Sequence, residues 1–168
     1  MVYSDRFQLI EDYLLHLDPL MANIQDAFIQ SRYLGFVTIS AVTVYELAIK
    51  DIFYEFAVRK HAVLGSFARS RFDRMNGQIK LDSLRDMHVK MFGQKYVDKF
   101  KSKLSTKEMA MLRAGQGSPV AAYGNIISWR HTFVHQGSAP NTTNYKEVKQ
   151  TYLLGKEVIH CLNEAMKR

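Results

Sequence analysis

The stretch that decides the fold is residues 36–60, which read FVTISAVTVYELAIKDIFYEFAVRK. Its apolar residues occupy nearly every side of a helix, which is typical of a helix in the middle of a bundle. Several of them are β-branched and favour strands, but about 25 residues of apolar pattern far exceed the length of a typical strand. We therefore predict a long central helix around which the other segments pack.

The segment before this stretch also has helical spacing. Its apolar residues recur every three or four positions, at Phe7, Ile10, Leu14 and Leu17, and predict a first helix over residues 4–17. Asp18 and Pro19 then resemble a helix start, with the Asp as cap and the Pro at the first helical position. We therefore expect the helix to kink or restart at Pro19 and to continue to about residue 32.

After residue 60 the pattern breaks into shorter helices. Gly77, which follows an Asn, and Gly93 are typical of helix stops. Ser105 with Glu108 three residues later fits a capping box, which predicts a helix start there. The glycines at 115 and 117 predict its end. Residues 61–117 should therefore form a set of short helices.

Two further helices complete the chain. Ser118 and Pro119 predict the start of one that runs to Gln136 and stops at Gly137. Residues 138–143 predict a loop, and Asn144 followed by Glu147 predicts the start of the last helix, over about residues 145–167. No segment shows a sustained strand pattern, so we predict an all-α protein.

Composition and length limit the class of protein. The 168 residues, 47% of them apolar and only three of them proline, predict one folded domain with a sizeable core. The single cysteine, Cys161, excludes a disulfide framework, and its spacing predicts a buried thiol rather than a nucleophile. Early charges argue against a signal peptide. Residues 33–45 lack charge but are shorter than the roughly 20 residues of a membrane span, so we expect a soluble, cytoplasmic protein.

Positive charge is concentrated in the middle of the chain. Residues 59–113 contain 14 lysines and arginines against 5 acidic residues, whereas the remainder contains 9 against 11. A one-sided basic segment is expected where a polyanion such as RNA binds, although it can also be a solvated face that aids solubility.

The residues suited to chemistry lie together at 129–137, which read WRHTFVHQG. The segment holds one arginine, Arg130, and two histidines, His131 and His135. Histidine suits proton transfer because its pKa of about 6.5 is close to neutral pH. Arginine suits a phosphate because it stays charged and its fork matches two oxygens. RNA cleavage without a metal needs both.

The form Arg-polar-x-x-x-His-x-Gly in this segment resembles the HEPN family of all-helical domains. It is nearest to the RiboL-PSP-HEPN and MAE-like branch, whose motif helix stops at a Gly just after the His. The resemblance implies a HEPN-like up-and-down helical bundle over residues 1–168, with extra short helices inserted at about 61–117. It also implies a metal-independent endoribonuclease, with no cofactor, that cuts by attack of the 2′-hydroxyl.

The same resemblance implies roles for the motif residues. His135 would be the general acid/base and Arg130 would stabilise charge on phosphorus. His131 would assist, at a position that is more often Asn or Asp in the family. The resemblance further implies RNA as substrate, a homodimer with the active site at its interface, and a toxin or a defence or stress effector with a possible antitoxin or defence-system partner.

Helix geometry raises a question about how Arg130 and His135 could act at one site. Five residues turn through about 500°, so Arg130 and His135 point about 140° apart on a regular helix. The long arginine could wrap toward the site, the last turn could tighten before Gly137, or two protomers could bring their motif helices together. We predict the third arrangement, a homodimer.

Three alternatives remain open on neighbouring residues. His131 and His135 share a face and could bind a metal, but no glutamate or third ligand is evident, so we predict none. Glu46 lies in the apolar stretch and needs a cation, either Lys50 or Arg32 near the surface, or Arg130 or a motif histidine in a supporting role. Aromatic residues among the lysines could stack on RNA or form a core face: Phe92, Tyr96 and Phe100.

A different class of function also fits the sequence. A catalytically inactive helical module could bind RNA, a nucleotide or a partner protein through the basic segment. It predicts salt-sensitive binding without reaction products.

Overall fold

The computed structural model describes residues 2–137 and 143–167, and every regular element in these ranges is a helix. The elements are α1 (Asp5–Met21), α2 (Ala27–Lys60), α3 (Ala62–Phe72), η1 (Ser83–His88), η2 (Val89–Phe92), α4 (Gln94–Arg113), α5 (Pro119–Gln136) and α6 (Tyr145–Met166). The predicted all-α class is confirmed. Residues 138–142 of the predicted loop lie outside the described residues.

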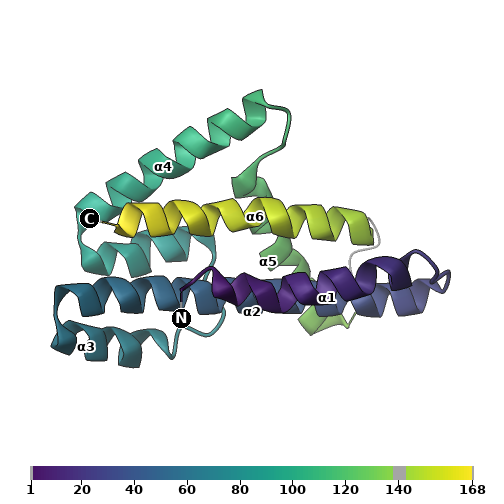
Figure 1. The fold of residues 1–168 in the computed structure, drawn as a ribbon, viewed down its shortest axis with the longest axis horizontal. Coiled ribbons are helices and arrows are strands. Elements are labelled where there is room, and N and C mark those ends of the chain that lie inside the picture. The colour runs from purple at the N-terminus through teal and green to yellow at the C-terminus, as the bar shows by residue number, and fades with distance from the viewer. Residues whose placement is uncertain (1, 138–142, 168) are drawn as a thin grey trace.

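Helix α2 is the centre of the bundle. It contacts α1, α3, α5 and α6, and Figure 1 shows α1 and α6 lying along it while α3 folds back against its end. Its buried residues occur along most of its 34-residue length. Burial of apolar side chains on all sides is the physical reason for its position, because such a helix loses most by exposure to water.

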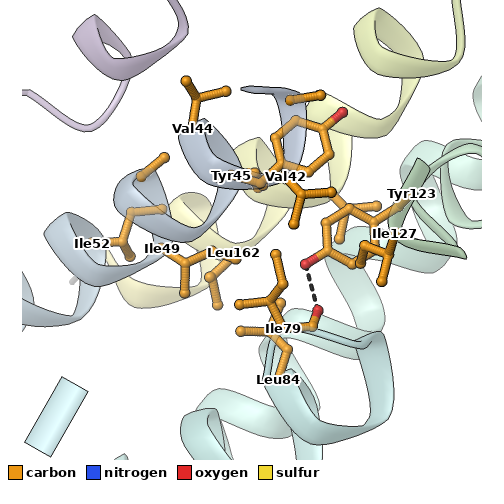
Figure 2. Packing of buried hydrophobic residues seen from close by; sticks show 14 of the residues in the cluster. Val42, Val44, Tyr45, Ile49, Ile52, Ile79, Leu84, Tyr123, Ile127 and Leu162 are labelled. Carbon is orange, nitrogen blue, oxygen red and sulfur yellow. Dashed lines mark hydrogen bonds between the residues drawn. The ribbon is translucent and has the colours of Figure 1, made fainter. Parts of the chain in front are cut away.

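Three tyrosines join α2 to the two last helices. The Tyr45 ring is stacked against Tyr123 of α5 and Tyr152 of α6, with centroid distances of 5.5 and 5.6 Å. The Tyr45 hydroxyl donates to the Tyr152 carbonyl at 2.5 Å, while the Tyr123 hydroxyl donates to the Ile79 carbonyl at 2.6 Å. Figure 2 shows this second bond beside Ile127 and Leu84. A Cβ at Gly155 would lie 2.6 Å from the Tyr45 oxygen, so only glycine allows this packing.

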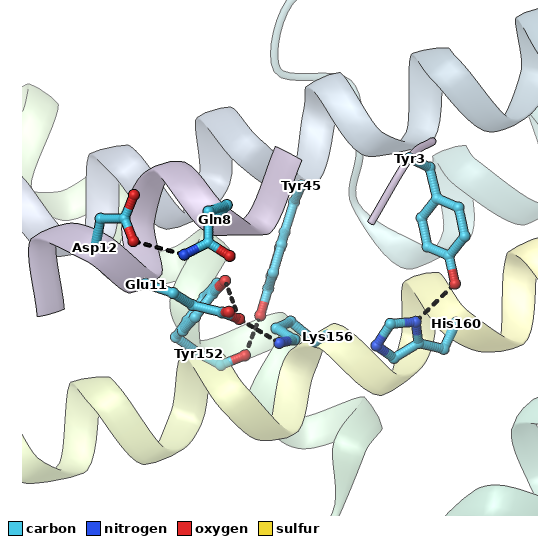
Figure 3. A network of polar contacts seen from close by, with 8 residues as sticks. All are labelled: Tyr3, Gln8, Glu11, Asp12, Tyr45, Tyr152, Lys156 and His160. Atoms are coloured by element: carbon cyan, nitrogen blue, oxygen red, sulfur yellow. Dashed lines mark hydrogen bonds and ion pairs between the residues drawn. The ribbon is translucent and has the colours of Figure 1, made fainter. Parts of the chain in front are cut away.

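Polar contacts hold α1 against α6 (Figure 3). Glu11 forms an ion pair with Lys156 and accepts a hydrogen bond from the Tyr152 hydroxyl at 3.4 Å. Near the N-terminus, the Tyr3 hydroxyl is 2.8 Å from Nδ1 of His160. These contacts fix the register of α1 on the bundle.

The predicted helix restart at Pro19 was wrong. Pro19 lies inside α1, and the chain turns at residues 22–26 instead. Asp26 caps α2 by accepting from the backbone amides of Phe28 and Ile29, so α2 begins well before the predicted start at residue 36. The side chain of Asp18 is used elsewhere, because it binds the Tyr145 hydroxyl at 2.8 Å and pairs with Lys149.

The predicted helix start at Ser105 was also wrong. Ser105 and Glu108 lie inside α4, which is 20 residues long rather than short. Glu108 instead accepts from the Ser118 hydroxyl and from the backbone amide of Val120, so it satisfies the first turn of a different helix, α5. The turns at Gly77 and Gly93 are found, with φ of 74° and 116°, a backbone conformation that favours glycine.

The aromatic residues of the basic segment belong to the core. Tyr96 and Phe100 are buried, and Phe92 is packed against the core. Tyr96 contacts the Phe56 ring at 4.9 Å, and Phe92 is stacked on Phe72 at 5.8 Å. Tyr96 and Phe100 are therefore not available to stack on RNA in this conformation, and the alternative interpretation of the three rings as a core face is confirmed.

Candidate active site

The candidate site lies on α5, whose ends match the prediction. The Ser118 hydroxyl accepts from the Ala121 amide at 2.9 Å, and Pro119 occupies the first turn. The helix ends at Gln136, where Gly137 adopts φ 71° and donates its amide to the Phe133 carbonyl at 2.9 Å. This closing bond spans four residues, so the last turn remains α-helical. The tightening of the last turn before Gly137, one of the three arrangements considered for Arg130 and His135, is not found.

The end of α5 is held by the first turns of α2. A Cβ at Gly35 would lie 2.0 Å from the Phe133 ring, so the ring packs directly on the glycine backbone. Arg32 donates to the Gly137 carbonyl at 3.0 Å, and its guanidinium lies 4.7 Å from the centre of the Phe28 ring. Sequence reasoning missed Gly35, although a glycine in an apolar helix is a usable signal of close helix packing.

The two histidines form an exposed pair. His131 and His135 share one face of α5, and their ring centroids are 4.3 Å apart with planes inclined by 53°. Neither forms a hydrogen bond or ion pair with another described residue. Among the described residues, no third His, Cys, Asp or Glu joins them in a group able to hold a metal ion. Both imidazoles are exposed to solvent.

Arg130 lies on a different side of the helix. At about 100° per residue it falls within roughly 60° of Ile126 and Phe133, and its side chain is partly buried. It forms no hydrogen bond with either histidine. Because α5 is regular here, Arg130 and His135 point about 140° apart within one chain. One chain therefore brings the two histidines together but leaves the arginine on the flank.

Glu46 is not placed with the motif. Its Oε1 is 2.7 Å from Lys50 Nζ, and its Oε2 accepts from the Gly77 amide at 2.7 Å. The pairing with Lys50 is the first of the alternatives that the sequence left open. Both oxygens are engaged in holding the turn before η1, so the supporting contact with Arg130 or a motif histidine is not formed.

A hollow beside His131 was missed by sequence reasoning. It has a volume of about 280 Å³ and is lined by Lys80, Leu81, Gly124, Ile127, Ser128 and His131. Lys80 and Leu81 come from the segment before η1, which is distant in the sequence. No local signal reveals such a pairing, although Gly124 and Ser128 precede His131 by seven and three residues and so share its side of a helix.

The basic segment presents part of its charge to solvent. Lys95, Lys99, Lys101 and Lys103 of α4 are exposed and form no ion pair with a described residue. Arg85 is neutralised by Asp82 and Asp86, and Lys107 pairs with Glu157 at 2.8 Å. Part of the available positive charge therefore lies along α4.

Comparison with known proteins places this bundle in a class. An all-helical bundle whose late helix carries Arg-x4-His and ends at a glycine is the arrangement of a HEPN domain. The family model described as RiboL-PSP-HEPN matches residues 2–168, and the chain belongs to this family. No curated protein and no solved structure shows a significant match. None of the described helices combines the length and apolar character needed to cross a membrane.

Proposed function

We propose that this protein is a metal-independent endoribonuclease whose active site forms where the α5 ends of two copies meet. The observation that carries the proposal is the exposed His131–His135 pair at the end of the Arg-x4-His helix. Membership of the RiboL-PSP-HEPN family supports an RNA-related role.

In the proposed reaction His135 takes the proton of the ribose 2′-hydroxyl, whose oxygen attacks phosphorus. The bond to the 5′-oxygen breaks, and a second imidazole protonates that oxygen. The products are a 2′,3′-cyclic phosphate and a 5′-hydroxyl. Arg130 stabilises the extra negative charge on the phosphoryl oxygens, and His131 orients the phosphate or supplies the second imidazole.

A second copy of the chain would bring an arginine and a histidine together, although Arg130 and His135 point apart within one chain. In a two-fold dimer each surface meets its own equivalent, so Arg130 of one protomer can face His135 of its partner. The neighbourhood of the α5 end favours such a contact, because it exposes large apolar side chains. Tyr13 and Phe36 contact each other at 5.3 Å and are 48% and 44% exposed, and Phe28 is 66% exposed. Exposed apolar groups of this kind mark interaction surfaces.

The chemical test is cleavage of RNA in EDTA by the purified protein. The proposal expects products with cyclic phosphate ends, and their loss in Arg130→Ala and His135→Ala. Unchanged cleavage by both variants would contradict the assigned roles. Salt-sensitive RNA binding without any product would favour the inactive binding module, for which the unpaired lysines of α4 provide a surface.

The dimer test mixes the two inactive variants. If Arg130 and His135 act across the interface, random pairing regenerates one intact site in half of the dimers, or about a quarter of wild-type activity. If both residues act within one chain, the mixture stays inactive. Phe36→Asp supplies an independent check, because it should shift the protein to a monomer in sedimentation.

A ribonuclease without a metal requirement needs control inside a cell. We propose a toxin or a defence or stress effector, restrained by a partner protein. Growth arrest on expression of the wild type, and its relief by His135→Ala, would be expected.

A further inference from the structure

The hollow beside His131 lies on the same stripe of α5 as the two histidines. Gly124, Ser128 and His131 stand at i, i+4 and i+7, and His135 follows at i+11, so all four share one side of the helix. The hollow has His131 at one edge, and the His131 ring contacts His135 at 4.3 Å. Whatever occupies the hollow is therefore held next to the imidazole pair.

We propose that this hollow binds one nucleotide of single-stranded RNA next to the cleaved phosphate. The proposal rests on the proposed function, which it deepens by naming how the substrate is held. In it a base lies over Leu81 and Ile127, and the Lys80 ammonium contacts a phosphate. The Ser128 hydroxyl and the His131 ring supply polar contacts.

The size and floor of the hollow fit a flat group. Its volume of about 280 Å³ is near the lower limit of small-molecule sites, roughly 300 Å³, which suits a single nucleotide better than a longer segment. Gly124 forms part of its wall, and a Cβ there would have no atom within 4 Å. The helix backbone is therefore bare at this point, and a ring can approach it closely.

The charge of the hollow suits a polyanion. Lys80 is exposed and forms no ion pair with a described residue, whereas its neighbour Asp82 is paired with Arg85 at 2.9 Å. The backbone beside Lys80 is fastened to α5, because the buried Tyr123 hydroxyl donates to the Ile79 carbonyl (Figure 2). A lysine that lines the same hollow as His131 is suited to recognise a phosphate.

A second hollow continues the path toward α4. It measures about 200 Å³, shares Leu81 with the first, and includes Lys101 in its lining. Because Leu81 lines both hollows, we propose that a strand leaving the first continues past Leu81 toward Lys101 of α4. Single-stranded RNA combines base contacts and backbone charge contacts in this way.

The test measures binding of a fluorescent, five-nucleotide single-stranded RNA to the His135→Ala variant by anisotropy at several salt concentrations. Adding Gly124→Leu places a side chain in the wall of the hollow, where its Cβ meets no atom within 4 Å, and we expect affinity to fall by between about 5-fold and about 150-fold, the value of one stacked base. Its melting temperature should stay equal or rise, because leucine favours helix more than glycine.

Two charge variants complete the experiment. Lys80→Gln should weaken binding and lower the salt slope by about one. Arg69→Gln is the control: it removes one exposed positive charge from α3, which packs on α2 (Figure 1), and should leave binding unchanged. If Gly124→Leu unfolds the protein, the binding of RNA by Lys80→Gln alone tests the proposed nucleotide site.

The outcomes separate this proposal from the nuclease. In a protein that keeps His135 and can therefore cleave RNA, Gly124→Leu should also change which bases flank the cleaved bond. The nucleotide site would be overturned if the wild type cleaves RNA while Gly124→Leu and Lys80→Gln keep the wild-type affinity and cutting pattern. That result would still support the proposed nuclease activity. RNA binding that both variants weaken, without any cleavage, would support the site and overturn the nuclease. No RNA binding at all would overturn the site.

Discussion

The two halves of α5 differ in what surrounds them, although one regular helix carries both. In the first half Tyr123, Ile126 and Ile127 are buried in the core, and Tyr123 also holds the segment before η1. In the second half His131 and His135 face solvent, and the helix contacts α2 mainly through Phe133. Substitutions in the first half of α5 should therefore change mainly the stability of the fold, and substitutions in the second half should change mainly the proposed activity.

The largest effect is expected at the exposed half. His135→Ala should lower RNA cleavage by about 100-fold to 10,000-fold, the contribution typical of a positioned acid or base. Its free energy of unfolding should change by less than about 0.5 kcal/mol, because the side chain is exposed and bonded to no described residue. Denaturant titration and a cleavage assay measure the two quantities. His16→Ala, which removes an exposed histidine of α1, is the control and should change neither.

The contact between the exposed half of α5 and α2 should be sensitive to a single methyl group. Gly35→Ala places a Cβ 2.0 Å from the Phe133 ring, so the ring must leave its position, at a cost of about 1–3 kcal/mol of stability. Because Phe133 lies between Arg130 and His135, cleavage should fall as well. Gly124→Ala is the matched control for stability: its Cβ meets nothing within 4 Å, and it should stabilise by about 0.5–1 kcal/mol. Equal stability in the two variants would contradict the packing described for Gly35.

The buried half should respond mainly in stability. Tyr123→Phe keeps the ring but leaves the buried Ile79 carbonyl without its hydrogen bond, which should cost about 1–3 kcal/mol. The control is Tyr13→Phe, since the Tyr13 ring is about half exposed. Urea unfolding of both variants measures the difference. A loss no larger than that of the control would show that the Ile79 contact adds little to stability.

The smallest effect concerns pH and lies outside α5. Burial lowers the pKa of His88, with the nearby Arg71 acting in the same direction, and burial also lowers the pKa of His160. As pH falls below about 6.5, the unfolded chain binds protons that the folded chain excludes, so the free energy of unfolding should decrease. In His88→Leu this decrease should be shallower, whatever its overall stability. Identical pH slopes in the two proteins would exclude His88 as a contributor.

Local signals in the sequence were sufficient for much of the fold. The length and apolar character of residues 36–60 predicted the central helix, and Ser118, Pro119 and Gly137 predicted both ends of α5. Asn144 predicted the start of α6, where it accepts from the Glu147 amide. Such signals work because helix periodicity and capping involve residues within four positions of one another.

The same kind of signal failed where a side chain had a distant partner. Asp18 has the form of a cap but binds Tyr145 and Lys149 of α6, so the predicted helix start beside it was wrong. Glu108 has the form of a capping box residue but binds the first turn of α5. In both positions a polar side chain that could cap its own helix instead bonds to a different helix, because packing brings that helix close.

The sequence by itself determined the helical class, the position of the motif at the end of one helix, and the shared face of His131 and His135, because these depend only on local spacing. Tertiary structure decided that Glu46 pairs with Lys50, that Phe133 rests on Gly35, and that Lys80 stands beside His131. These contacts join residues far apart in the chain, and they exist only because the packed core fixes α2, α5 and the segment before η1 against one another.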